Sequence, residues 1–95
     1  MNILDRGGKP LARLTAFINA AMDEAKYKIF EDGTFFGEIE NCPGVWSNEL
    51  TLETCRAILQ EILEEWLLMK IRDGDPLPVV KGIDLNVINE LVKES

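Results

Sequence analysis

The sequence predicts one α+β domain, in which a long helix packs on a mostly antiparallel sheet of three to four strands and an extra helix precedes the sheet. Three observations predict this fold. Asp32-Gly33 lies between two β-favouring runs, apolar residues recur at helical spacing over residues 52–72, and prolines follow that helix. A length of 95 residues fits a single domain, 1–95.

The first part of the chain predicts a helix after a flexible lead-in. Residues 1–9 contain Gly7-Gly8 and have no periodicity. Pro10 suits the first helical position, which needs no N–H donor. Apolar residues, among them Phe17, then recur at helical spacing, so we expect a helix over residues 10–25.

Asp32-Gly33 predicts a hairpin between strands at residues 27–31 and 34–40. Asp-Gly favours a two-residue type I′ turn, in which both residues have positive φ. Such a turn places Phe30 opposite Phe35 and Ile29 opposite Phe36. Alternation then divides the side chains between two faces: Tyr27, Ile29 and Phe36 on one, and Phe30, Phe35 and Ile39 on the other. One helix covers one face, so we expect the N-terminal helix, another subunit or a partner to cover the second.

The second half predicts a short strand over residues 45–47 and a long helix over residues 52–72. Thr51 is the expected N-cap, and Gly74 is expected to end the helix in a left-handed conformation. Leu68 falls on the polar face, which indicates a helix-end contact or an interface. Residues 78–80 suggest a fourth, edge strand, and Asp84 suggests the cap of a short final helix. The apolar arc comprises Leu52, Cys55, Ile58, Leu59, Ile62, Leu63, Trp66, Leu67 and Met69.

Composition restricts the function classes. The formal net charge is −7, which disfavours direct nucleic-acid binding and suits a basic protein partner, although it also simply keeps a small protein soluble. The sequence contains no histidine, the commonest general base and metal ligand. Cys42 and Cys55 do not form a metal-binding pattern. With no apolar run of membrane-spanning length and no signal-peptide pattern, we expect a cytoplasmic protein with free thiols.

No residue constellation predicts catalysis, a cofactor or a metal site. Asp73 and Asp75 flank a glycine and are better explained by the end of a helix than by Mg²⁺ binding. Glu38 and Glu40 share one strand face and are better explained as solvated positions than as an acid–base pair. Trp46 is ambiguous between core and interface. We therefore expect a binding module and no enzyme.

Residues 27–78 resemble the HicB family of type II toxin–antitoxin systems. The resemblance consists of Glu31-Asp32-Gly33 ending the first strand, Phe36 in the second, Pro43-Gly44-Val45, Thr51-Leu52-Glu53 opening the helix, and Gly74-Asp75-Pro76-Leu77-Pro78 after it. It implies a partial ribonuclease-H-like βββαβ unit, with an antitoxin-like core at residues 26–80. It also implies an antitoxin that covers the active site of HicA, a small basic mRNA-cleaving toxin.

The chain departs from the family pattern in three ways. Many members carry a DNA-binding module at the C-terminus, whereas residues 81–95 are predicted to form a tail with a short helix, so we do not expect DNA binding from this chain. Asn48-Glu49 stands where the family often has glycine. The N-terminal helix lies outside the resemblance and is expected to cover the second sheet face within one subunit or across a dimer.

Two functional hypotheses follow. In the first, the chain neutralises a basic HicA-like toxin, and the predicted partner-binding residues are Glu38, Glu40, Trp46, Asn48 and Glu49. In the second, it is an orphan HicB-like oligomeric interaction module without a toxin. We expect a homo-oligomer in either case, and the predicted oligomer-interface residues are Phe17, Phe30, Phe35, Ile39 and Leu68.

Overall fold

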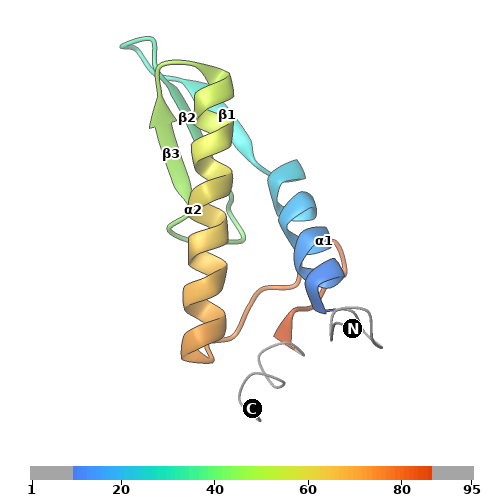
Figure 1. Cartoon of the computed structure of the whole chain (residues 1–95). Helices are drawn as coiled ribbons and strands as arrows, with labels where there is room; N and C mark the ends of the chain where they lie inside the picture. Colours follow the sequence, from blue (N-terminus) through green and yellow to red (C-terminus); the bar gives the residue numbers. More distant parts are fainter. Residues whose placement is uncertain (1–9, 87–95) are drawn as a thin grey trace.

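A computed structural model describes residues 10–86 of the chain, and its elements follow the order α-β-β-β-α. The elements are α1 (Pro10–Asp23), β1 (Lys26–Ile29), β2 (Phe35–Glu38), β3 (Trp46–Glu49) and α2 (Leu52–Asp73). The strands form one antiparallel sheet in the order β1-β2-β3, and the upper half of α2 lies against one face of it (Figure 1). The predicted α+β fold is confirmed.

α2 begins and ends where the sequence predicts, because both ends are set by local hydrogen bonds. The Thr51 side chain accepts a hydrogen bond from the backbone N–H of Thr54 at 3.1 Å, which satisfies one of the unpaired donors of the first turn. Gly74 ends the helix with φ 72°, and its N–H reaches back to the carbonyls of Lys70 and Ile71. The fully buried stripe of α2 consists of Cys55, Leu59, Leu63 and Leu67.

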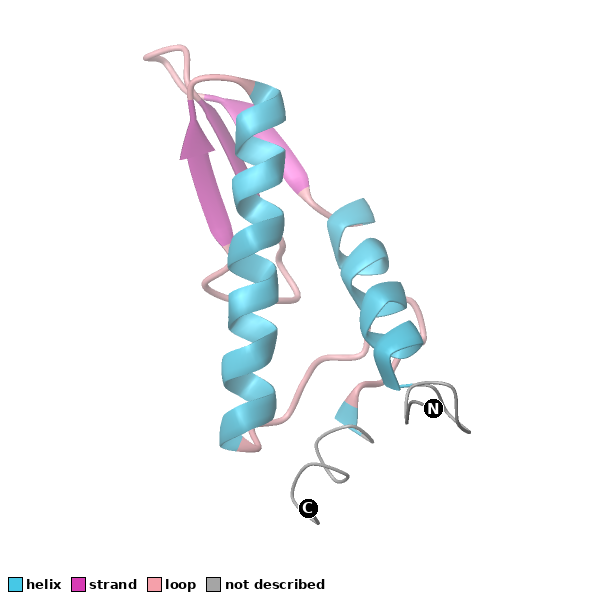
Figure 2. Cartoon of the chain, in the orientation of Figure 1, coloured by secondary structure: helices cyan, strands magenta, loops and turns pink. Residues whose placement is uncertain are grey.

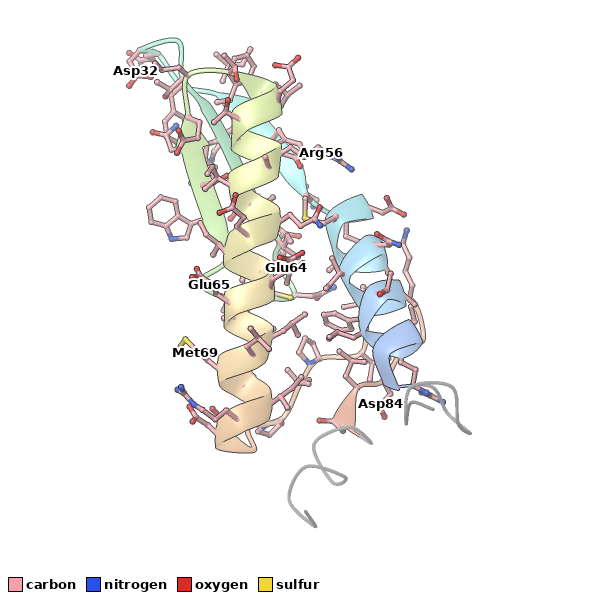
Figure 3. All side chains as sticks on the ribbon, in the orientation of Figure 1. Asp32, Arg56, Glu64, Glu65, Met69 and Asp84 are labelled. Carbon is pink, nitrogen blue, oxygen red and sulfur yellow. The ribbon has the colours of Figure 1, made fainter. Side chains whose placement is uncertain are left out.

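The hairpin loop is one residue longer than predicted. The N–H of Phe30 bonds the carbonyl of Thr34 and the N–H of Gly33 bonds the carbonyl of Phe30, so the loop has three residues, 31–33. Gly33 has φ 85°, but Asp32 does not have positive φ, which rules out the predicted type I′ turn. Asp32, at the hairpin tip in Figure 3, instead accepts hydrogen bonds from the backbone N–H and the hydroxyl of Thr34.

The longer loop exchanges the two faces of β2. Ile29 now pairs with Phe35 and Lys28 with Phe36, and a shift of one residue turns every side chain of a strand to the opposite face. The predicted grouping of Phe35 with Phe30 is therefore wrong. Tyr27, Ile29 and Phe35 share the face toward α2, whereas Phe30 and Phe36 lie on the opposite face.

α1 does not cover that opposite face. It lies beside the lower half of α2, and the loop after α2 crosses to α1 and runs along it (Figure 2). Two long-range contacts join the returning loop to α1: Lys81 to Asp23 at 3.5 Å and Arg13 to the carbonyl of Asp84 at 3.4 Å. The shared core comprises Phe17, Ala20, Ala21, Met22, Ile39, Cys42, Val45, Leu59, Leu63, Leu67, Leu77, Val80 and Leu85.

The expected fourth strand, the apolar arc of α2 and the chain termini are the remaining features of the predicted fold. The fourth strand does not join the sheet, because Val80 forms an isolated bridge with Ile83 across a tight turn. Leu52 and Met69, expected in the buried arc, are exposed. Asp84 accepts a hydrogen bond from the N–H of Asn86, as a helix cap does, but the lead-in 1–9 and the body of the predicted final helix lie outside the described residues.

Candidate functional site

The sheet face opposite α2, which we call the open face, carries a row of stacked aromatic rings. Phe30 and Phe36 have ring centroids 5.2 Å apart, and Phe36 and Trp46 have centroids 5.9 Å apart. Each strand contributes to the row, since Phe30 follows β1, Phe36 lies on β2 and Trp46 begins β3. Within residues 10–86, no helix or strand packs on this face.

The row is exposed to solvent and held in place by a cation. Trp46 is 54% exposed and Phe30 is 38% exposed, which is unusual for side chains that contribute so much apolar surface. The ammonium group of Lys28 lies 5.3 Å from the centroid of Phe36 and 5.7 Å from that of Phe30. Cation–π attraction of this kind is worth about 0.5–1 kcal/mol at an exposed site and, with the ring stacking, favours this arrangement of the rings before any partner arrives.

Charged groups border the row on its β1 side. Lys26 lies opposite Glu38 in the register of β1 and β2, and Glu38 lies opposite Trp46 in the register of β2 and β3. Lys26 also forms a 3.0 Å ion pair with Glu40, whose exposure limits its worth to a fraction of a kcal/mol. The open face thus combines an apolar centre with two lysines and two glutamates.

Four of the five predicted partner-binding residues meet at this face. Glu38, Glu40, Trp46 and Asn48 lie on or beside it, whereas Glu49 pairs with Phe35 on the face toward α2. The Asn48 amide donates to the carbonyl of Phe35 and to the Thr34 hydroxyl, both at 2.9 Å, so it ties β3 to the start of β2.

The predicted oligomer-interface residues do not form one surface. Phe17 and Ile39 are buried in the chain's own core, so a surface contact on this fold does not reach them, and Phe35 faces α2. Phe30 is on the open face. Leu68 is 64% exposed on α2, at a small groove that Leu14 and Ile18 of α1 also line.

Sequence reasoning missed the roles of Lys28 and Phe36. Both follow from the register, because a three-residue loop turns Phe36 toward Phe30 and leaves the Lys28 ammonium group beside both rings. The signal was present in Glu31-Asp32-Gly33-Thr34, where an aspartate two residues before a threonine favours a side-chain-closed turn over a type I′ turn.

Other polar groups are already bonded to one another. A polar cleft between α1 and the sheet is lined by Asp23, Glu24, Lys26, Glu40 and Asn41. Its members pair internally, since Asn41 donates to Glu24 at 2.9 Å and Lys26 binds Glu40. The described residues contain no cluster of three or more side chains suited to a metal ion, and none of their helices is long and apolar enough to cross a bilayer.

The buried serine on β3 is also hydrogen-bonded within the chain. Ser47 is buried between β3 and α2, and its hydroxyl donates to the carbonyl of Cys55 at 2.8 Å. The Cys55 thiol lies 3.2 Å from the same hydroxyl. This contact joins β3 to the first turns of α2, and it satisfies a buried polar group that would otherwise destabilise the fold.

Both cysteine thiols are expected to be unreactive in the folded protein. Burial, together with the nearby Glu24 carboxylate, raises the pKa of Cys42 to about 11, so the nucleophilic thiolate is scarce at neutral pH. Cys55 is also buried. We expect a thiol-reactive disulfide reagent to label neither residue rapidly at mildly alkaline pH and to label both once urea unfolds the chain. Rapid labelling of the native protein contradicts this placement.

Comparison with known proteins identifies a family and solved structures similar to this chain. A family model described as UPF0150-like matches residues 16–78, which include the whole sheet and α2. The crystal structure of TTHA0281 from Thermus thermophilus is similar, with a TM-score of 0.72 and 36% sequence identity over 76% of this chain and 90% of that chain. None of the curated proteins matches the chain.

Proposed function

Since the chain belongs to the UPF0150-like family, which is related to the HicB-like antitoxins, we propose that it is a HicB-like antitoxin. It binds a small basic HicA-type toxin and neutralises it by covering the toxin's active site. The resemblance of residues 27–78 to HicB sequences supports the same assignment. The protein acts by binding and has no catalytic activity of its own, which agrees with a sequence that contains no histidine.

The observation that carries this proposal is the unpartnered row of Phe30, Phe36 and Trp46 on the open face. Aromatic side chains dominate binding energy at protein interfaces when they become fully desolvated, and ordered rings lose little conformational freedom on binding. A toxin seated on this row covers the sheet face that the rest of the described chain leaves exposed.

Glu38 supplies the charge contact at the border of that surface. It lies on the middle strand beside Trp46, whereas Glu40 is already paired with Lys26. No ion pair to Glu38 is present within residues 10–86, so its carboxylate is available to a lysine or arginine of a basic partner. The net charge of −7 adds long-range attraction, which raises the association rate more than the affinity.

Charge reversal at Glu38 tests this surface. Glu38→Lys is expected to weaken binding of a catalytically inactive HicA-type toxin by about 10-fold or more, because it replaces an attractive contact with a repulsive one. Binding is measured by isothermal titration calorimetry, and a growth assay with the active toxin measures neutralisation.

Glu65→Lys is the matched control. Glu65 is exposed on α2, which packs on the sheet face that Ser47 occupies and Trp46 does not, and its reversal changes the net charge by the same amount. Loss of affinity at Glu38 alone supports the open face. Equal losses at both positions indicate that net charge alone matters, and failure of the unaltered protein to bind or neutralise the toxin overturns the antitoxin assignment.

An orphan oligomeric module is the second candidate. The observation that favours it is the charge balance of the open face, where two lysines offset two glutamates and no excess of acidic groups selects a basic partner. In this case the protein has no toxin, and the same aromatic row serves self-association.

A further inference from the structure

We propose that in the free protein a second copy of the chain covers the open face, forming a weak dimer that a bound partner displaces. Dimerisation through the row of Phe30, Phe36 and Trp46 follows from this chain alone, whereas the displacement step rests on the proposed function.

The charge distribution selects a second copy as the occupant. Two chains of net charge −7 repel each other over most of their surfaces. On the open face, however, Lys26 and Lys28 offset Glu38 and Glu40, so the local charges sum to zero around an apolar centre. This face is therefore where two copies approach with little electrostatic cost while burying exposed aromatic rings.

The strand order makes the face self-complementary. A two-fold axis parallel to the strands, passing above the central strand, lays β1 of one copy over β3 of the other. Lys26 of one copy then lies near Trp46 of its partner, where cation–π attraction is available, and Phe36 faces its own counterpart. Glu38 also lies on the central strand and is brought near its counterpart, which is the one repulsive contact of this arrangement.

The size of the face predicts a weak dimer. Strands spaced about 4.8 Å apart, with a rise of about 3.3 Å per residue, give a three-stranded, four-residue sheet a face of roughly 200 Å² before side chains are counted. Stable interfaces bury about 800 Å² on each partner. Self-association is thus expected only at high protein concentration, and a larger partner interface that includes the same rings displaces the second copy.

Analytical ultracentrifugation over a wide concentration range tests the dimer. The mass of the unaltered chain is expected to rise with concentration toward that of two chains. Trp46→Ser is expected to raise the dissociation constant by about 10-fold or more, because it removes the most exposed ring of the row. Circular dichroism confirms that this surface substitution leaves the fold intact.

Leu68→Ser is the matched control, since Leu68 is 64% exposed, against 54% for Trp46, but lies at the groove between α1 and α2. It is expected to leave the dimer unchanged. The proposal is overturned if the unaltered chain stays monomeric at the highest concentration, if Trp46→Ser dimerises as well as the unaltered chain, or if Leu68→Ser abolishes the dimer.

Salt and Glu38→Gln separate this inference from the antitoxin assignment. Added salt screens the repulsion between two acidic chains and strengthens the dimer, whereas it weakens binding of a basic toxin. Glu38→Gln removes the like-charge contact and is expected to tighten the dimer while loosening the toxin complex. A dimer that weakens with salt, or with Glu38→Gln, contradicts the proposed arrangement whether or not a toxin binds.

Discussion

Replacing Leu63 with alanine is expected to lower the free energy of unfolding by about 3 kcal/mol. Leu63 is fully buried where α2 meets the shared core, and truncating a buried leucine removes its transfer free energy and leaves a cavity. The total stability of such a domain is about 5–10 kcal/mol, so this single change removes a large fraction of it.

Leu68→Ala gives the reference for that measurement. Leu68 lies on the same helix and undergoes the same chemical change, but its side chain is 64% exposed, so the expected cost is within about 0.5 kcal/mol. Urea unfolding followed by circular dichroism measures both free energies. Similar costs at the two positions contradict the orientation of α2, because they imply that the two leucines are equally buried.

Locally determined features could be predicted from the sequence. Thr51 begins α2 and Gly74 ends it through hydrogen bonds made within a few residues. The apolar spacing of α2 identifies the leucines of its buried stripe. Met69, at the margin of the same arc, was misplaced, because α2 extends beyond the sheet and α1 lies on the other side of that part of the helix (Figure 3).

Long-range contacts explain why α1 was not placed from the sequence. Its position depends on the returning loop, where Lys81 and Asp84 meet Asp23 and Arg13 across more than half the chain. Phe17 belongs to an apolar arc in any arrangement, and its spacing alone does not show whether the arc meets the sheet, another subunit or α2. The structure places Phe17 in the core that α1 and α2 share.

The candidate site could be predicted only in part, because some of its residues depend on the pairing of β1 with β2. Trp46 and Glu38 were identified from residue type and alternation, which do not depend on the hairpin register of β1 against β2. The aromatic row does depend on it. One additional loop residue moves Phe36 beside Phe30 and Phe35 toward α2, so the choice between two turn types decides whether the open face carries a continuous row.

Gly37→Ala is expected to destabilise the domain by about 2 kcal/mol, because the centre of β2 has no space for a methyl group. A Cβ at this position would lie 2.8 Å from Cε1 of Tyr27 and 3.2 Å from the Cys55 sulfur. Gly37 is buried, with the Tyr27 ring lying across it beneath α2, so neither neighbour moves without disturbing the core. Urea unfolding measures the loss.

A double-mutant cycle assigns that loss to the tyrosine ring. Tyr27→Val creates space above Gly37, so adding Gly37→Ala to this variant is expected to cost about 1 kcal/mol less than in the unaltered chain. Tyr27→Phe keeps the ring and removes only the hydroxyl, which lies near Arg56, so it is expected to show no such relief. Additive costs in the Tyr27→Val cycle would mean that the ring does not lie across Gly37. In that case the register that also brings Phe36 into the aromatic row would be wrong.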